Sequence, residues 1–367
     1  MIVRRNLLKL GALAAAAAPF AASFAAPPPV GTARPAITPD EAFLRLVHPD
    51  LRVAAANLLH GSTYVIPTRT TLGAMRSAMT ARLPKLRPDV PTMQRTIPGA
   101  TGQPDVAIVV VNARADALRP AILHTHGGGF VAGSAALGLA ELQEICVALD
   151  CVAVSVDYRL APEIRWTGSC EDTYAALKWL HDHAFELGAH PDRIAVMGEG
   201  AGGGHAALLA IMARDRGEVP LVFQCLTYPM LDDRTVTRKF VPHVGRVIWT
   251  PEANRFGWEC FLGMAPAGKG VPAAAVPARC TELAGLPPAF IGAGALDLLF
   301  NENADYAQRL NVAGVPAQLA AVPGAFHGFD LVAPQAPVSA AFRATRLDAL
   351  RRALALAPLT VRVGERD

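Results

Sequence analysis

The chain has 367 residues, of which 52% are hydrophobic and 18% are charged. This composition is typical of a globular protein and excludes an intrinsically disordered one. The 34 basic and 31 acidic side chains give a formal charge of +3, which is too small for the basic surface that nucleic-acid binding requires. We therefore expect no nucleic-acid partner.

The first 26 residues have the pattern of an export signal. Arg4 and Arg5 precede an apolar, Ala-rich run that ends in small residues near Ala26, and the arginine pair resembles the start of a bacterial twin-arginine signal. We predict an export signal at 1–26, a Pro-rich linker at 27–37, and an exported protein, periplasmic or secreted, from a bacterium. The alternative is an ordinary Ala-rich first helix or an uncleaved anchor. No internal stretch reaches the 18 or so apolar residues of a membrane-spanning helix, so we expect no stable membrane insertion after the signal is removed.

Apolar residues recur at helical spacing in the next part of the chain. They are Leu44, Leu46, Val47 and Leu51, followed by Leu72, Met75, Met79 and Leu83. This spacing predicts amphipathic helices. We assign residues 38–100 to N-terminal cap helices and a lead-in to the main domain.

Short apolar runs alternate with helical stretches over residues 101–357. The runs are at 106–111, 121–124, 152–156, 194–197, 221–226, 289–291 and 317–322, and the helical stretches include 137–149, 170–187, 201–214 and 302–312. This alternation predicts an α/β domain with a mostly parallel central sheet and helices on both faces. Residues from about 232 to 284 interrupt the alternation, and we assign them to the same helical cap.

The six cysteines, at 146, 151, 170, 225, 260 and 280, have no C-x-x-C spacing. Paired cysteines at that spacing are typical of zinc sites. We therefore expect no metal, and we expect no organic cofactor either.

A run of glycines follows the predicted strand at 121–124. It reads His126-Gly127-Gly128-Gly129-Phe130. Consecutive glycines allow a tight turn and expose backbone N–H groups, which an oxyanion hole needs where negative charge develops on a carbonyl oxygen. The next strand is followed by residues 157–163, D-Y-R-L-A-P-E, which we interpret as a structural loop held by an Arg159–Glu163 pair.

A second glycine-rich segment joins the predicted strand at 194–197 to a helix. Residues 198–202 read G-E-G-A-G and match the G-x-S-x-G nucleophile elbow except that Gly200 stands at the serine position. Asp297 and His327 follow later in the chain. Nucleophile position, acid and base thus occur in the chain order of the α/β-hydrolases.

Together these motifs resemble the hormone-sensitive-lipase-like family of bacterial carboxylesterases, acetyl hydrolases and arylesterases. Residues 228–232, Y-P-M-L-D, are also similar to that family, and the likeness extends from about residue 106 to residue 331. The resemblance implies an α/β-hydrolase fold with a helical cap and a small-molecule ester as substrate or ligand. The oligomeric state stays open, with a homo-oligomer as one alternative.

The resemblance also implies roles for particular residues. The backbone of Gly128, Gly129 and Ala201 would form the oxyanion hole. His327 would be the general base and Asp297 would orient it. The family has a serine nucleophile where this chain has Gly200, which has no atom that could attack a carbonyl.

Three functional hypotheses follow. The first is an inactivated or strongly impaired esterase for short or medium acyl or aryl esters, and the second is a non-catalytic, ligand-binding pseudoenzyme of the same fold. The third is an NAD(P)-dependent oxidoreductase, because Gly198, Gly200 and Gly203 also fit the G-x-G-x-x-G pattern. That pattern normally belongs to the first strand of a fold and has an acidic partner about 20 residues later.

Several other residues have both a structural and a functional interpretation. We expect His124, Glu199 and His205 to be structural, although the last two are close to the elbow in sequence. Four residues are candidates either for an acyl pocket or for packing within the cap: Phe43, Met75, Met79 and Trp249.

Overall fold

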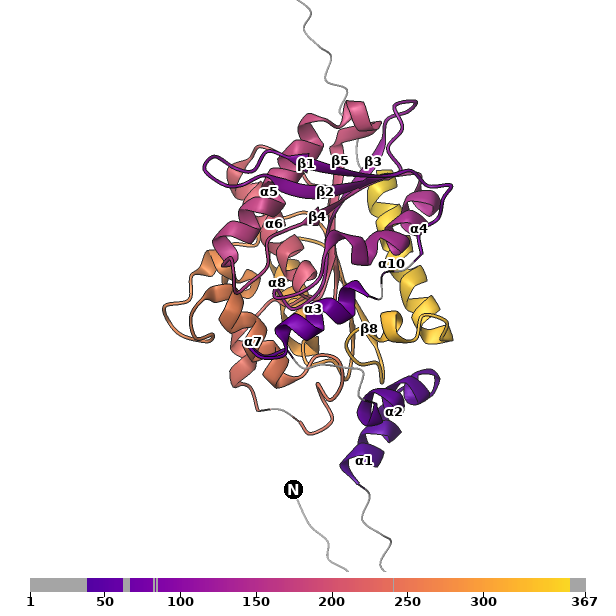
Figure 1. Cartoon of the computed structure of the whole chain (residues 1–367), viewed down its shortest axis with the longest axis vertical. Coiled ribbons are helices and arrows are strands. Elements are labelled where there is room, and N and C mark those ends of the chain that lie inside the picture. The colour runs from indigo at the N-terminus through magenta and orange to yellow at the C-terminus, as the bar shows by residue number, and fades with distance from the viewer. Residues whose placement is uncertain (1–37, 62–66, 82, 84, 240, 357–367) are drawn as a thin grey trace, which may run out of the picture. The chain divides into compact units, whose positions relative to one another are not determined.

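The computed structural model describes residues 38–61, 67–81, 83, 85–239 and 241–356. The predicted signal and linker lie outside the described residues. Eight strands form one sheet in the order β1-β2-β4-β3-β5-β6-β7-β8 (Figure 1). Their bounds are β1 Thr92–Ile97, β2 Val106–Val111, β3 Arg119–Thr125, β4 Val152–Asp157, β5 Ala189–Glu199, β6 Phe223–Thr227, β7 Ala289–Gly294 and β8 Ala317–Val322.

The sheet is mostly parallel. β2 pairs antiparallel with both β1 and β4, and all the remaining pairs are parallel. Every one of the seven predicted strands is present, and the predicted fold class is confirmed. The sequence interpretation missed β1, because five of its six residues are exposed and it has no apolar alternation.

Helices and short 3₁₀ turns connect the strands. The α-helices are α1 Pro39–Leu46, α2 Arg52–His60, α3 Leu72–Thr80, α4 Leu139–Leu149, α5 Trp166–Asp182, α6 Ala201–Arg216, α7 Pro251–Leu262, α8 Phe300–Val312, α9 Phe329–Val332 and α10 Pro337–Leu356. The 3₁₀ turns are η1 Pro49–Leu51, η2 Ala135–Gly138, η3 Phe185–Leu187, η4 Asp233–Thr237, η5 Ala273–Ala275 and η6 Pro277–Arg279.

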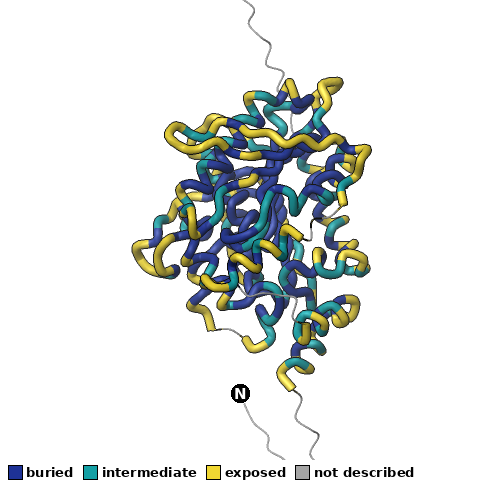
Figure 2. The backbone as a smooth tube through the Cα atoms, in the orientation of Figure 1, coloured by how far each residue is buried: buried dark blue, intermediate teal, exposed yellow. Residues whose placement is uncertain are grey.

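Two apolar clusters cover the two faces of the sheet. Side chains of α5, α6 and α8 pack with one set of strand residues, including Leu123. Side chains of α1, α4 and α10 pack with the other set, including its neighbour Ile122. Successive residues of a strand point to opposite faces, so a sheet buried on both sides has continuously apolar strands. Figure 2 shows the buried residues gathered along these central strands.

The predicted Arg159–Glu163 pair is wrong, because each of the two residues forms an ion pair with a different partner. The guanidinium of Arg159 binds the buried carboxylate of Asp172, 2.7 Å away. Glu163 instead binds Arg76 of α3 at 2.8 Å, and Arg76 also donates to the carbonyl of Val131. The loop is thus tied to α5 and α3, elements distant in sequence that local spacing does not identify.

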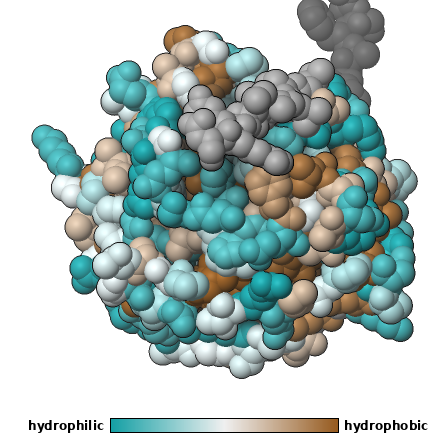
Figure 3. Space-filling model, turned by 90° about the horizontal axis from the view of Figure 1, so that it is seen from above, coloured by the Kyte–Doolittle hydropathy of each residue, from teal (hydrophilic) through white to brown (hydrophobic). Residues whose placement is uncertain are grey.

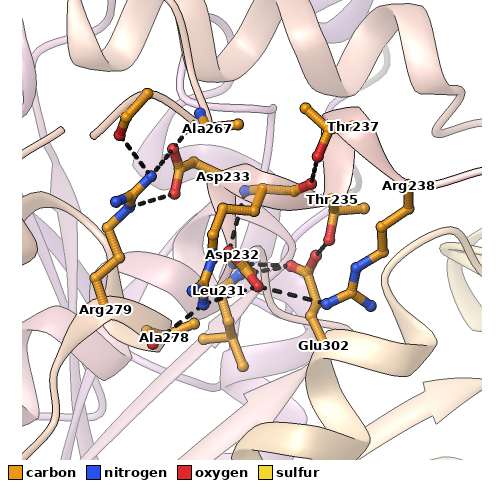
Figure 4. A network of polar contacts seen from close by, with 12 residues as sticks. Leu231, Asp232, Asp233, Thr235, Thr237, Arg238, Ala267, Ala278, Arg279 and Glu302 are labelled. Atoms are coloured by element: carbon orange, nitrogen blue, oxygen red, sulfur yellow. Dashed lines mark hydrogen bonds and ion pairs between the residues drawn. The ribbon is translucent and has the colours of Figure 1, made fainter. Parts of the chain in front are cut away.

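A buried ion pair and buried hydrogen bonds anchor the segment predicted as a cap insertion. The carboxylate of Asp233 accepts hydrogen bonds from Arg279 at 2.7 and 2.9 Å and from the N–H of Ala267 at 2.6 Å (Figure 4). Glu302 of α8 accepts a bond from the N–H of Leu231 at 2.7 Å and another from Thr235. Burial raises the pKa of Glu302 to about 8. The Asp233 contacts hold the segment together, and the Glu302 contacts fix its base to α8.

The described surface carries scattered apolar side chains, among them Phe185 and Val312. On the face seen in Figure 3 hydrophilic and hydrophobic residues are intermixed, as is ordinary for a folded surface. None of the described helices has the length and apolar character needed to cross a membrane. All six cysteines are free thiols. Within the same residues no three His, Cys, Asp or Glu side chains are grouped to hold a metal.

Candidate active site

The turn from β5 into α6 places Gly200 in an unusual backbone conformation, with φ 55° and ψ −117°. L-residues rarely adopt a positive φ of this kind. The turn is fixed on both sides, because the Gly200 N–H donates to the carbonyl of Thr227 at 3.0 Å and its carbonyl accepts from Met230 at 2.9 Å. A Cβ at Gly202 would lie 2.0 Å from the carbonyl oxygen of Thr125. Glycine there lets α6 approach β3 closely.

His327 and Asp297 meet beside this turn. Nδ1 of His327 lies 2.8 Å from Oδ2 of Asp297, whose side chain is fully buried. The other carboxylate oxygen accepts the N–H of Leu299 at 2.9 Å. Because a carboxylate only accepts, Nδ1 carries the hydrogen and Nε2 of the neutral ring keeps a free lone pair.

Nε2 of His327 faces Gly200. A Cβ built at Gly200 would lie 3.5 Å from Nε2 and 3.8 Å from Cε1, with no other atom within 4 Å. The basic nitrogen therefore points at the position from which a side chain on the elbow would project. The structure brings together the three residues that the sequence interpretation selected as nucleophile position, acid and base.

The glycine run of residues 126–130 lies next to this turn, since a Cβ at Gly127 would lie 3.1 Å from the carbonyl oxygen of Glu199. Gly128 and Gly129 have φ values of 129° and 64°. A Cβ at Gly128 would lie 2.0 Å from the carbonyl oxygen of Ala132, and a Cβ at Gly129 would lie 2.2 Å from Cη2 of Trp249. No described group accepts a hydrogen bond from the N–H of Gly128, Gly129 or Ala201. Ala201 begins α6, so the helix dipole adds to the attraction for an anion there.

Aromatic side chains enclose the site. The ring of Trp249 lies with its centroid 6.1 Å from that of His327, and Nε1 of Trp249 donates to Asn254 at 3.2 Å. Trp249 packs in an apolar cluster with Phe130, Trp258 and Phe261. Among the other pocket candidates, Phe43 packs in the cluster that covers the α4 and α10 face of the sheet.

Tyr228 is a site neighbour that the sequence interpretation did not single out. Its ring centroid lies 4.6 Å from that of His327, and its hydroxyl donates to Asp330 at 3.1 Å. Burial raises the pKa of Asp330 to about 6. The Y-P-M-L-D segment was the available signal, but nothing in its spacing places the ring against an imidazole 99 residues later.

Three histidines near the site are buried. His124 bonds to Ser155 and Glu199, at 2.9 and 3.0 Å, which agrees with a structural role. Burial lowers the pKa of His126 to about 4 and that of His205 to about 3, so both rings are neutral at neutral pH. His327 is thus the histidine whose ring faces the elbow.

Comparisons with known proteins identify the family of the fold. A family model for the alpha/beta hydrolase fold matches residues 122–331. The carboxylesterase NlhH of Mycobacterium tuberculosis is 36% identical over 279 residues, covering 74% of this chain and 85% of that protein. An arylesterase of Saccharolobus solfataricus is 30% identical over 57% of this chain and 67% of its own length. Among solved structures, a bacterial heroin esterase matches with a TM-score of 0.77 and 37% identity, covering 85% of this chain and 99% of the other.

Proposed function

The chain belongs to the alpha/beta hydrolase family, in its hormone-sensitive-lipase-like group, and from this premise we propose that its site binds carboxylic esters and hydrolyses them only slowly. Short or medium acyl or aryl esters are the proposed substrates. The position of the nucleophilic serine is occupied by Gly200. The matched region includes Gly198, Gly200 and Gly203, which leaves the oxidoreductase hypothesis without support.

One observation carries the proposal: Nε2 of His327 faces the position of a Gly200 side chain, 3.5 Å from its Cβ. In a serine esterase the hydroxyl at that position passes its proton to histidine and forms an acyl-enzyme. Glycine cannot form that bond. The groups left in such sites retain about 10³–10⁴-fold catalysis over the reaction in water.

The remaining groups support direct attack by water. His327 takes a proton from water through Nε2 while the water oxygen bonds to the ester carbon. Asp297 holds the ring in the required tautomer and stabilises the imidazolium. The N–H groups of Gly128, Gly129 and Ala201 bind the oxyanion. The oxyanion then restores the C=O bond, the bond to the alkoxy or aryloxy group breaks, and the imidazolium protonates that leaving group, so the acid forms without an acyl-enzyme intermediate.

The test is hydrolysis of 4-nitrophenyl acetate by this chain and by Gly200→Ser. If Asp297 and His327 act as proposed, the serine variant is faster by at least about 10³-fold. A fluorophosphonate should label the serine variant alone. Gly217→Ser is the matched control, because Gly217 also has a positive φ, at the other end of α6. Equal rates for the chain and Gly200→Ser would overturn the proposal.

A non-catalytic ligand-binding role is the second candidate. Its support is that the N–H groups of Gly128 and Gly129 belong to the backbone, so their geometry does not depend on a hydroxyl at position 200. A ligand-observed NMR titration with a short aryl ester separates the two roles. Bound ester that stays intact for days favours the pseudoenzyme, whereas accumulating acid favours slow hydrolysis.

A further inference from the structure

Tyr228, directly after β6, has a backbone conformation that is rare for a residue with a side chain. Its φ is 36°, and residues other than glycine are strained in this region. The conformation is held by the N–H of Tyr228, which donates to the carbonyl of Gly292 at 2.6 Å. Backbone strain of this kind gathers at functional sites, where the surrounding structure offsets its cost. Tyr228 is therefore a candidate for a role in the site beyond packing.

The side chain of Tyr228 bridges His327 and Asp330. Its ring centroid lies 4.6 Å from that of His327, and its hydroxyl donates to Oδ1 of Asp330 at 3.1 Å. The ring is buried and held at both ends, so it restricts the movement of the imidazole. Asp297 holds the same imidazole through Nδ1. His327 is thus positioned by a hydrogen bond and by a fixed aromatic ring.

The carboxyl group of Asp330 is buried, and Asp330 follows His327 by three positions in the chain. Oδ1 accepts the Tyr228 hydroxyl, whereas Oδ2 has no hydrogen-bond partner among the described residues. Burial raises the pKa of Asp330 to about 6. The charge of Glu199 at the end of β5 also raises this pKa, and the Tyr228 hydroxyl and Arg343 of α10 lower it. The group is therefore mostly ionised at pH 7 and mostly neutral at pH 5.

We propose that Tyr228 and Asp330 are positioning residues for the base His327. The ring of Tyr228 fixes the direction of the imidazole, and the negative charge of Asp330 stabilises the imidazolium that forms when His327 takes a proton. The inference rests on the proposed function, to which it adds a second carboxylate besides Asp297. Asp330 is buried away from any ester, so its loss should lower kcat and leave KM nearly unchanged.

The pH dependence of one substitution tests the role of this charge. In the full chain carrying Gly200→Ser, Asp330→Asn should lower kcat for 4-nitrophenyl acetate at pH 7 by about 3–10-fold, because a nearby negative charge stabilises an imidazolium by this order inside a protein. At pH 5 Asp330 is mostly protonated in the parent as well, so the two kcat values should be nearly equal. A loss of packing alone would lower kcat by the same factor at both pH values.

Two further variants and a control make the test specific. Tyr228→Phe keeps the ring and removes the hydroxyl that bonds to Asp330, so the pKa of Asp330 rises and its charge is lost at pH 7. The double variant with Asp330→Asn should then be no slower than the slower single variant. Asp348 is exposed on α10, and Asp348→Asn should leave kcat unchanged at both pH values. If Asp330→Asn does not fold, the pH dependence of kcat in Tyr228→Phe still tests the pair.

A titration of the unaltered chain needs no turnover and separates the two proposals. ¹H NMR follows the imidazole signals with pH, and the His327 signal is identified by its absence from His327→Gln. In Asp330→Asn the pH at which His327 is half protonated should be lower by about 0.5–1, the equivalent of a 3–10-fold change. If Gly200→Ser hydrolyses no ester, the proposed function is wrong, and this titration still tests the pair. If Gly200→Ser is active, an unchanged titration or a loss of kcat that does not depend on pH would overturn the role of Asp330.

Discussion

Nε2 of His124 lies 3.0 Å from Oε2 of Glu199, the residue directly before Gly200. Both side chains are almost completely buried. On its other side Nδ1 of His124 lies 2.9 Å from the hydroxyl of Ser155, which donates to the carbonyl of Ala135. The hydroxyl hydrogen is thus used, so His124 donates through Nδ1. A single proton must therefore be shared between Nε2 and the Glu199 carboxylate.

This shared proton predicts different effects for two substitutions of Glu199. Glu199→Ala removes the partner of a buried histidine and should lower the free energy of unfolding by about 3–5 kcal/mol. Glu199→Gln can donate its amide hydrogen to Nε2 of neutral His124 and should cost only about 1–2 kcal/mol. Urea denaturation measures both. Equal losses would show that the hydrogen bond to His124 contributes little.

The conformation of Gly200 predicts a stability cost for any side chain there. With φ 55° and ψ −117°, Gly200→Ala should lower the free energy of unfolding by about 1–3 kcal/mol. Gly217, with φ 67° and ψ 14°, lies in the ordinary left-handed region, so Gly217→Ala should cost about 1 kcal/mol. Chemical denaturation of the two variants checks the order. A Gly200→Ala variant as stable as the unaltered chain would contradict strain at the turn.

The buried carboxyl of Glu302 predicts a pH dependence of stability. Burial raises its pKa from 4.5 to about 8, so the unfolded chain releases this proton first as the pH rises. The protonated carboxyl contributes fully to the free energy of unfolding below pH 4.5. This contribution is lost as the pH rises toward 8, by up to about 1.4 kcal/mol per pH unit. Glu302→Gln keeps the acceptor for the N–H of Leu231 and can donate to Thr235, so it mimics the protonated form.

Denaturation of both proteins between pH 5 and pH 8 tests this. The loss of stability with rising pH should be smaller in Glu302→Gln than in the unaltered chain. Parallel pH profiles would indicate that the carboxyl is already ionised in the folded protein. Glu282 is exposed in the loop before β7, and Glu282→Gln is the control that should leave the profile unchanged.

The contact between Gly129 and Trp249 predicts a strong effect on catalysis. A Cβ at Gly129 would lie 2.2 Å from Cη2 of Trp249, so Gly129→Ala must move the ring or the loop that carries the N–H donors. In the Gly200→Ser background this should lower kcat by about 10²–10³-fold, as for the loss of one oxyanion donor. Gly73→Ala on α3 is the control, because a Cβ there meets nothing within 4 Å. Unchanged kcat would exclude this loop from oxyanion binding.

The arginine pair predicts the route of export. Replacing Arg4 and Arg5 with lysine should block transport of the full chain, because the twin-arginine pathway depends on this pair. Immunoblots of periplasmic and cytoplasmic fractions from a bacterial host measure how much of the chain is transported. Undiminished export of the double variant would point to a different signal.

The sequence by itself determined the class of the fold, and it predicted the residues of the proposed site. Apolar runs of strand length between helical stretches predicted seven of the eight strands, because a parallel sheet covered on both faces needs continuously apolar strands. The glycine runs and the order of Gly200, Asp297 and His327 identified the same turn and side chains that the structure brings together. These features are local, since each is carried by a few neighbouring residues.

Only the tertiary structure decided how distant residues meet. It placed Tyr228 against His327, paired Arg76 with Glu163 in place of the predicted Arg159, and put Trp249 over Gly129. It also revealed β1, whose exposed residues carry no apolar pattern. Such contacts depend on how helices pack on the sheet, and many distant partners are compatible with the same local sequence. The physical reason is that packing is a property of the whole core, whereas strand period and turn conformation are set within a few residues.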